Sequence, residues 1–384
     1  MTAVVVVGGG LAGVWAAITA ARAGAEVTLV SRAPGATALY AGAIEIAPDL
    51  EAVLANEPYH PFTRLYRDHL QLAADLEEVA SSFAAELKRA GLPVSGEARS
   101  RGRYADLHGF PRAAQLVPVT VAPGELGGLR GRRVAVASVE GVGDYDAEST
   151  AAALAEQGVK ASAVRAPMKD LPPEAALGDL FGRPAPTVRT TADLVAFPPG
   201  FVKLPKDGFE LLAAAPSPHG WRLQKALEKM LRAAQVNVVG AEVTDFRRES
   251  DRLQAALTAA GELAADSFVL ASGRFIGGGL VKSRLVREPL LDLAVYYQGE
   301  TIEAAYPRLR HLEYLDPAPA FRTGLLTDKE LRPVDAAGAP AFANLRAAGS
   351  VLGGYDYAGG GCGFGLPLLT GRLAGRLAAG MEGG

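Results

Sequence analysis

Three glycines near the N-terminus, Gly8, Gly10 and Gly13, form the pattern G-x-G-x-x-G, and Leu11 and Ala12 complete the loop. Four consecutive valines precede the pattern and an alanine-rich stretch follows it, so it lies between a predicted strand and a predicted helix. In such a turn the first glycine permits a tight bend, the second lets a phosphate approach, and the third lets the helix pack on the strand. The phosphate then meets free N–H groups at the positive end of the helix. The sequence therefore predicts a nucleotide-type phosphate site.

The second predicted strand, residues 26–30, ends in Ser31 and Arg32, whereas dinucleotide-binding folds usually place an acidic residue there to bind the ribose hydroxyls. A serine binds a ribose hydroxyl less strongly than a carboxylate does, and an arginine suits an additional phosphate. These two residues leave open whether the ligand carries an adenosine half.

Later segments carry small residues at places that meet the cofactor in two-domain flavoproteins. The stretch 33–48, which holds Gly42, is small enough to pass under a flavin ring, although an ordinary surface loop fits its composition equally well. Near the C-terminus a short strand leads to Gly349 and Ser350, where those flavoproteins have Gly-Asp, and a glycine-rich run precedes the last helix. The N-terminus of that helix would face the pyrimidine end of the ring, where negative charge develops on reduction. The other candidate flavin contacts are Val243, Gly273, Gly360, Gly361 and Cys362.

The bulk composition is that of a globular protein with two domains. The chain has 384 residues, of which 49% are hydrophobic and 21% charged, and its net charge of −3 disfavours nucleic acid as a partner. The single cysteine, Cys362, excludes a disulfide framework, a Cys₄ iron–sulfur cluster and a zinc ribbon within the chain, and it fits a reducing, cytoplasmic setting. We expect the nearly uncharged stretch 3–21 to be neither a signal peptide nor a membrane span, because three glycines interrupt it.

Hydrophobic periodicity predicts the elements that must position these residues. We expect mostly amphipathic helix over 51–92, a second strand–helix–strand unit over 134–164, and loops and short helices over the proline-rich 165–220. A helix over 223–234 and a strand over 236–239 follow, then a three-stranded meander (243–246, 254–258, 268–270) and a last helix over 366–379. The predicted fold class is α/β, with a Rossmann-like FAD/NAD(P)-binding domain (parallel sheet plus β-meander) and a second, less regular α+β domain. The expected flavin domain comprises 1–50, 221–280 and 336–384, and the expected substrate or partner domain 51–220 and 281–335.

The sequence resembles the B subunit of the bacterial anaerobic glycerol-3-phosphate dehydrogenase. The resemblance covers roughly residues 1–50 and 220–384. The segments that carry it are Gly8–Gly13, Ser31–Arg32, Leu270–Val281, Arg287–Pro289, Thr327–Pro333 and Gly349–Asp356. The family shares the missing acidic residues at both nucleotide positions.

The resemblance implies a flavoprotein that is assigned FMN, works with a catalytic FAD-bearing A subunit, and docks on an iron–sulfur C subunit at the membrane. It implies oxidation of sn-glycerol 3-phosphate to dihydroxyacetone phosphate, with electrons passed towards quinone. It further implies a cytoplasmic protein that meets the inner face of the membrane only through its partners. FMN has no adenosine, so it would not need a carboxylate beside Ser31. A pyrophosphate-type loop, however, can bind more phosphate than the single phosphate of FMN, so FAD stays open.

Oxidising an alcohol requires a base near the hydroxyl and, for a phosphorylated substrate, cations near the phosphate. His219, Arg274 and Arg332 are the candidates, with Arg287 as a further arginine, because all lie in or beside the segments that carry the resemblance. Each residue fits a structural role equally well. Two alternatives stay open: a flavin-binding protein that only relays electrons or scaffolds its partners, and an unrelated FAD- or NAD-dependent oxidoreductase. If the chain works in a complex, exposed apolar surface on the second domain should mark the partner interface.

Overall fold

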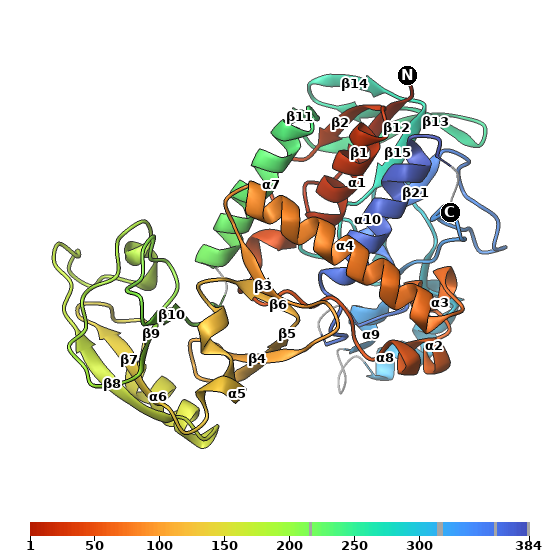
Figure 1. Ribbon diagram of the computed structural model, residues 1–384. Coiled ribbons are helices and arrows are strands. Elements are labelled where there is room, and N and C mark those ends of the chain that lie inside the picture. The colour runs from red at the N-terminus through yellow and green to blue at the C-terminus, as the bar shows by residue number, and fades with distance from the viewer. Residues whose placement is uncertain (215–216, 313–317, 357–358, 382–384) are drawn as a thin grey trace. The chain divides into compact units, whose positions relative to one another are not determined.

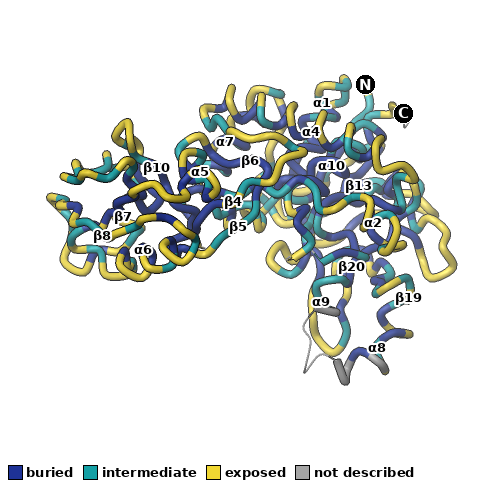
Figure 2. Tube along the Cα trace, turned by 60° about the horizontal axis from the view of Figure 1, so that its bottom comes forward, coloured by how far each residue is buried: buried dark blue, intermediate teal, exposed yellow. Residues whose placement is uncertain are grey.

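The computed structural model describes residues 1–384 except 215–216, 313–317, 357–358 and 382–384 (Figure 1). The chain forms two compact units. Unit 1 comprises Met1–Thr37, Ile46–Glu86 and Leu227–Gly384, and unit 2 comprises Ala38–Glu45 and Leu87–Ala226. Each unit has its own parallel sheet. The central strands of both sheets are mainly buried, whereas one edge strand of each sheet is not (Figure 2).

Unit 1 is built on a five-stranded parallel sheet in the order β11-β2-β1-β15-β21. The valine run forms the centre of the sheet because apolar residues on both faces suit a strand that is covered on both sides. The strands are β1 (Ala3–Val7), β2 (Glu26–Val30), β11 (Asn237–Val239), β15 (Ser267–Leu270) and β21 (Leu345–Ala347). This sheet confirms the predicted Rossmann-like α/β fold.

Two helices from opposite ends of the chain, α1 (Leu11–Arg22) and α10 (Gly365–Ala378), lie side by side in unit 1 (Figure 1). Glycines permit this close approach. A Cβ added at Gly371 would lie 2.6 Å from the carbonyl oxygen of Ala12, and one added at Gly375 would lie 2.4 Å from that of Ala16. The packing therefore holds the C-terminal segment against the first turns of α1.

The meander differs from the predicted one in its third strand. It consists of β12 (Val243–Glu249), β13 (Arg252–Thr258) and β14 (Gly261–Ala264), all antiparallel. The predicted third strand, residues 268–270, instead belongs to β15 in the parallel sheet, so that assignment was wrong. All four residues of β15 are buried, whereas β12 and β14 are largely exposed, and only a strand covered on both faces suits the centre of the sheet.

The remaining elements of unit 1 are helices and small two- and three-stranded sheets. The predicted helical run over 51–92 is divided into three helices, and Pro61 begins the second. The helices are α2 (Leu50–Asn56), α3 (Pro61–Leu65), α4 (His69–Arg89), α8 (Ile302–Leu312) and α9 (Ala318–Arg322). The short strands are β16 (Val281–Lys282), β17 (Val286–Arg287), β18 (Val295–Tyr297), β19 (Glu300–Thr301) and β20 (Gly324–Leu325).

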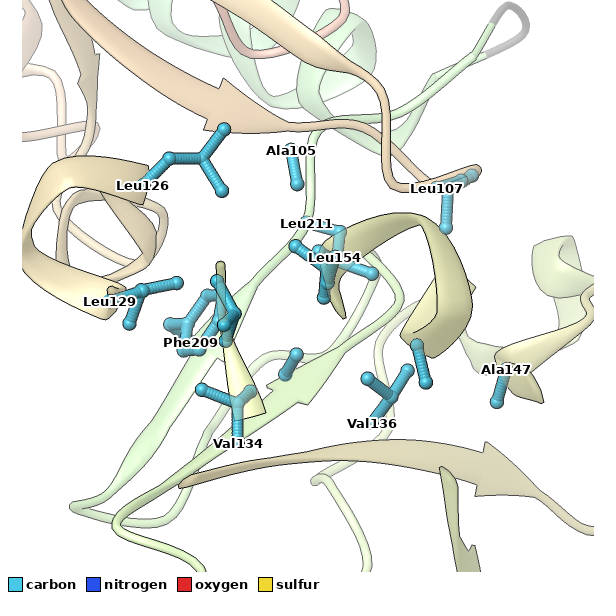
Figure 3. Packing of buried hydrophobic residues seen from close by; sticks show 13 residues of the cluster. Ala105, Leu107, Leu126, Leu129, Val134, Val136, Ala147, Leu154, Phe209 and Leu211 are labelled. Carbon is cyan, nitrogen blue, oxygen red and sulfur yellow. The ribbon is translucent and has the colours of Figure 1, made fainter. Parts of the chain in front are cut away.

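Unit 2 contains a four-stranded parallel sheet in the order β10-β9-β7-β8. Its strands are β7 (Arg133–Val139), β8 (Lys160–Ala166), β9 (Leu194–Phe197) and β10 (Gly208–Glu210), and α6 (Ala147–Glu156) connects the first two. Figure 3 shows the core, in which Val134, Val136, Leu154 and Phe209 pack together. The predicted strand–helix–strand unit is confirmed. The proline-rich stretch was expected to hold loops and short helices, but it also supplies β9 and β10.

The rest of unit 2 consists of two hairpins and short helical segments. The hairpins pair β3 (Val94–Gly96) with β6 (Leu116–Pro118) and β4 (Gly102–Ala105) with β5 (Pro111–Ala114). Helix α5 (Leu126–Leu129) follows them, and α7 (Pro218–Ala233) begins in unit 2.

The compact units and the expected domains have different boundaries. Unit 1 contains the three expected flavin segments almost entirely, but it also contains 51–86 and 281–335. A compact unit does not reveal which ligand it binds, so the division into a flavin domain and a substrate or partner domain stays a prediction.

Candidate functional site

Two of the three motif glycines are required by the packing of the chain itself. Gly8 has a φ of +117°, and a Cβ added to it would lie 2.2 Å from the carbonyl oxygen of Ala271. A Cβ added at Gly13 would lie 1.9 Å from the carbonyl oxygen of Gly8. These glycines therefore bring β1, α1 and the end of β15 into contact.

Gly10, the second motif glycine, has no such neighbour. It is the N-cap of α1, has an ordinary φ of −77°, and makes no side-chain capping hydrogen bond. A Cβ added there would meet only Thr37 Oγ1 at 3.7 Å. The packing of the protein therefore does not demand glycine here, whereas a ligand that approaches the backbone would. The helix N-terminus and the open space beside Gly10 fit a flavin phosphate.

Thr37 belongs to this loop and escaped the sequence-based prediction. Its Oγ1 accepts a hydrogen bond of 3.0 Å from the backbone N–H of Leu11. A Cβ added at Gly35 would lie 3.2 Å from the Cα of Gly10, so the segment after β2 runs close beside the glycine loop. A threonine a few residues beyond the second strand is a weak signal, because only the tertiary fold brings it to the helix N-terminus.

Ser31 and Arg32 lie at the end of β2 with partners that the sequence pattern does not predict. The hydroxyl of Ser31 donates to the carbonyl of Ala33 at 2.7 Å. Arg32 forms an exposed ion pair of 2.9 Å with Glu242. Glu242 directly precedes β12, whose first residue, Val243, is buried. A carboxylate thus lies near the end of β2 after all, but another segment supplies it.

The C-terminal Gly-Ser lies directly on α1. Gly349 has a φ of +77°, and a Cβ added to it would lie 2.5 Å from the Cβ of Ala12. A Cβ added at Gly273, which has a φ of +78°, would lie 3.7 Å from Ser350 Oγ. The structure therefore brings four predicted contacts, Ala12, Gly273, Gly349 and Ser350, to the glycine loop in unit 1.

Arg274 anchors this C-terminal segment. Its guanidinium is 3% exposed and donates hydrogen bonds to the carbonyls of Ser350, Phe321 and Leu352. It also lies 5.2 Å from the centre of the Tyr355 ring. These contacts give Arg274 a positioning role, and its catalytic role stays a prediction. The neighbouring Ser272 has a buried Oγ with no hydrogen-bond partner among the described residues, which leaves a polar atom for a ligand to satisfy.

The glycine-rich run before α10 lies next to a cleft. Gly361 has a φ of +66°, and Cys362, which follows it, is buried. Gly360 lines a cleft of about 360 Å³ beside α2 and the start of α3, which we call the α2–α3 cleft. Its charged and aromatic lining residues are Asp49, Glu57, His60, Arg322, Tyr355 and Asp356. None of these six was predicted as a site residue.

Arg332, the third candidate catalytic residue, is neutralised by its own turn in unit 1. Its Nε donates to Asp328 at 2.7 Å, and its Nη1 lies 3.6 Å from Glu330. An anion would have to displace these carboxylates to bind. Arg287 has an exposed position in β17, at the edge of a two-stranded hairpin.

His219 and Gly42 come together in unit 2. A Cβ added at Gly42 would lie 2.9 Å from Cδ2 of His219. Nε2 of His219 lies 3.4 Å from the carbonyl oxygen of Leu211, and its buried Nδ1 has no partner among the described residues. Burial lowers the pKa of His219, an effect that the nearby Glu210 carboxylate opposes, so the ring is neutral at neutral pH.

Glu210 and Arg222 form a buried ion pair next to this histidine. The guanidinium of Arg222 contacts both carboxylate oxygens, at 2.8 and 3.0 Å, and Thr120 and the N–H of Gly200 also donate to the carboxylate. Burial of Glu210 would raise its pKa, but these donors outweigh burial and hold the pKa below its usual value. The pair fixes the start of α7, from which His219 projects.

Comparison with known proteins identifies the family of the chain. Residues 3–366 match the family described as FAD binding domain. The B subunit of the anaerobic glycerol-3-phosphate dehydrogenase of Yersinia pseudotuberculosis is 30% identical over 421 aligned residues, which cover 96% of this chain and 95% of the relative. The chain belongs to this family of B subunits. A relative from Halobacterium salinarum, named a probable B subunit of the same enzyme, is 28% identical and covers 98% of this chain and 97% of its own length.

Among solved structures, a 3-ketosteroid-Δ4-(5α)-dehydrogenase from Rhodococcus jostii matches 99% of the chain and 96% of its own length, with a TM-score of 0.43 and 16% identity. A 3-ketosteroid Δ1-dehydrogenase from Sterolibacterium denitrificans matches 99% and 100%, with a TM-score of 0.47 and 12% identity. Both are distant structural neighbours of this chain. Within the described part of the chain, no helix is both long and apolar enough to cross a bilayer.

Proposed function

We propose that the chain is the flavin-binding B subunit of a glycerol-3-phosphate dehydrogenase complex. In this proposal it oxidises sn-glycerol 3-phosphate to dihydroxyacetone phosphate and passes the electrons towards quinone. The observation that carries the proposal is the open helix N-terminus at Gly10, on which Gly349 and Ser350 converge, in a chain that matches B-subunit relatives over nearly its whole length.

For the cofactor we propose FAD, with FMN as the alternative that the resemblance implies. Two features support FAD. The glycine loop is of the kind that holds a pyrophosphate, and Glu242 places a carboxylate near the end of β2, where a ribose would need one. FMN would use neither the second phosphate position nor Glu242.

Oxidising the secondary alcohol removes a proton from the hydroxyl and a hydride from the carbon. A bound flavin would supply the acceptor for the electron pair. The chain itself must hold the flavin phosphate beside Gly10, at the N-terminus of α1. There Thr37 Oγ1 already accepts from the N–H of Leu11, so the other N–H groups of the first turn would meet the anion. It must also supply a base. His219 is a candidate by its own chemistry, because its neutral ring has an Nδ1 with no partner among the described residues that can take a proton.

A second candidate is a flavin-binding electron relay, with the substrate oxidised on the A subunit. One observation favours it: two of the predicted catalytic residues are already engaged within the chain. Arg274 donates to three backbone carbonyls, and Arg332 is held by two carboxylates. In either case we propose that the protein meets its partners, the A subunit and the iron–sulfur C subunit, by exposed apolar residues of unit 2, and through them the inner face of the membrane. The most exposed are Val202, Phe110 and Trp221.

The test begins with the purified full-length chain. We would record its visible spectrum, release the cofactor with acid and determine its mass, which identifies FAD or FMN. Anaerobic addition of sn-glycerol 3-phosphate should then bleach the flavin absorbance if this chain oxidises substrate. A flavin that dithionite bleaches but the substrate does not would support the relay. A chain that binds neither flavin would refute both.

A further inference from the structure

We propose that the α2–α3 cleft is the binding site for a small phosphorylated polyol, with Arg322 and His60 holding the phosphate and nearby carboxylates accepting from the hydroxyls. This inference rests on the proposed function, since it assigns the substrate of that reaction to a place in unit 1. The cleft volume of about 360 Å³ is at the lower end of the range for small-molecule sites, so a three-carbon phosphate fits its size.

His60 lines the cleft and carries one hydrogen-bond donor on its ring. It is the N-cap of α3, and its Nδ1 accepts a hydrogen bond of 3.0 Å from the backbone N–H of Phe62. Because Nδ1 is the acceptor, the neutral ring must carry its proton on Nε2. The side chain is 2% exposed, and burial together with the Arg322 charge lowers its pKa to about 3. At neutral pH the imidazole is therefore neutral and can donate from Nε2.

The orientation of this ring is fixed by its neighbours. It packs against Phe62, with ring centres 4.8 Å apart, and against the edge of Tyr355 at 5.5 Å. Tyr355 is in turn covered by the guanidinium of Arg274. A donor held by packing and by a helix cap is preorganised, so little entropy is lost when it binds an oxygen.

Arg322 brings the positive charge. It is the last residue of α9, and its backbone carbonyl accepts from the N–H of Gly354, which fixes the chain beside the cleft. Within the described part of the chain its guanidinium has neither an ion pair nor a hydrogen bond. An arginine that lines a cleft and lacks a carboxylate partner is suited to bind a phosphate, because its fork of donors matches the phosphate oxygens.

Three carboxylates make the site selective for a hydroxylated anion. One oxygen of Asp49 accepts from the N–H of Ala52, and an ionised carboxylate has about four acceptor positions, so this bond does not saturate Asp49. Asp356 accepts from the N–H of Gly359 and has further contacts of its own. Glu57 also lines the cleft. A ligand with anionic groups throughout would be repelled by these carboxylates, and a neutral polyol would give the guanidinium of Arg322 no anionic acceptor. A polyol monophosphate offers its hydroxyls to the carboxylates and its phosphate to Arg322 and His60.

The experiment measures binding to the flavin-loaded full-length chain by isothermal titration calorimetry, with sn-glycerol 3-phosphate, glycerol and inorganic phosphate as ligands. Arg322→Met removes the charge but keeps the length of the side chain, and Arg322→Lys keeps the charge. His60→Asn retains an acceptor for the α3 cap, but its side chain is shorter, so its amide donor no longer stands at the position of Nε2. The matched control is Arg247→Met, at an exposed arginine of β12 that pairs with Glu262.

We expect the wild-type chain to bind glycerol 3-phosphate more tightly than glycerol. Arg322→Met and His60→Asn should each weaken that binding tenfold to a hundredfold, the usual effect of losing a charge-assisted hydrogen bond, while Arg322→Lys should recover part of it. Arg247→Met should bind as the wild type does. Thermal unfolding of each variant shows whether it is folded.

The outcomes separate this inference from the proposed function. Suppose that the substrate bleaches the flavin but Arg322→Met and His60→Asn bind the substrate within twofold of the wild type. Substrate binding in the α2–α3 cleft is then refuted, whereas oxidation of the substrate by this chain is supported. If those variants lose substrate binding but the substrate does not bleach the wild-type flavin, the binding site in the cleft is supported. The electron-relay function is then favoured over oxidation of the substrate by this chain. A wild-type chain that binds neither glycerol 3-phosphate nor inorganic phosphate refutes the cleft.

Discussion

Gly10→Ala should weaken flavin binding without unfolding the protein. The new methyl group would meet only Thr37 Oγ1 at 3.7 Å, which is ordinary van der Waals contact, and the φ of −77° suits alanine. The free energy of unfolding should change by less than about 1 kcal/mol, because alanine is a slightly poorer N-cap than glycine but restricts the unfolded chain. Any larger effect must therefore come from the ligand.

The expected loss of affinity follows from the contacts that the methyl group would block. It would occupy the space through which a phosphate reaches the N–H groups at the start of α1. A hydrogen bond to a charged group contributes about 1.5–3 kcal/mol, so losing one weakens binding roughly tenfold to a hundredfold. Gly13→Ala provides the contrast, because its Cβ would lie 1.9 Å from the carbonyl oxygen of Gly8 and should destabilise the apoprotein itself.

The assay has two readouts on the apoprotein. Urea unfolding gives the stability of the wild type, Gly10→Ala and Gly13→Ala, and titration with flavin, followed by the quenching of its fluorescence, gives the affinity. We expect Gly10→Ala to unfold as the wild type does and to bind flavin weakly. If Gly10→Ala binds flavin within twofold of the wild type, the phosphate does not approach this glycine and the placement of the cofactor is refuted.

Three further predictions concern single charges. Glu242→Gln should weaken FAD binding by about tenfold and leave FMN binding unchanged, as measured by the same titration; an equal loss for both flavins would contradict a ribose contact. The pKa of His60 is lowered from 6.5 to about 3 in the folded protein, so the unfolded chain takes up the proton first as the pH falls. The free energy of unfolding should therefore fall below pH 6.5, and His60 alone should lower it by about 1.4 kcal/mol at pH 5.5. The free energy measured by urea unfolding should depend less on pH in His60→Asn than in the wild type. Arg222→Met leaves Glu210 buried without its partner and should cost about 3–5 kcal/mol of unfolding free energy, most of which an added Glu210→Met should restore; no recovery would argue against the pair.

Much of unit 1 could be predicted because its signals are local. Four valines followed by three spaced glycines specify a buried strand, a tight turn and a helix within about fifteen residues, and β1 and α1 form as expected. The same holds for the strand–helix–strand unit of unit 2, where Asp146 caps α6 through its own side chain. The assignment of 268–270 failed because a short apolar run fits a meander strand and a central strand equally well. Only its neighbours β1 and β21 distinguish the two.

The sequence alone was sufficient to predict the strand, glycine turn and helix at the N-terminus, because the glycine pattern lies within six consecutive residues. The contacts of Glu242 with Arg32 and of Thr37 with Leu11 depend on residues that meet only after the sheet has formed. The same is true of the α2–α3 cleft, whose His60 and Arg322 are far apart in the sequence. Tertiary structure also decided that Arg274 binds backbone carbonyls, which no residue pattern can indicate. Hydrogen bonds and charges between distant segments require positions in space, and spacing along the chain does not specify them.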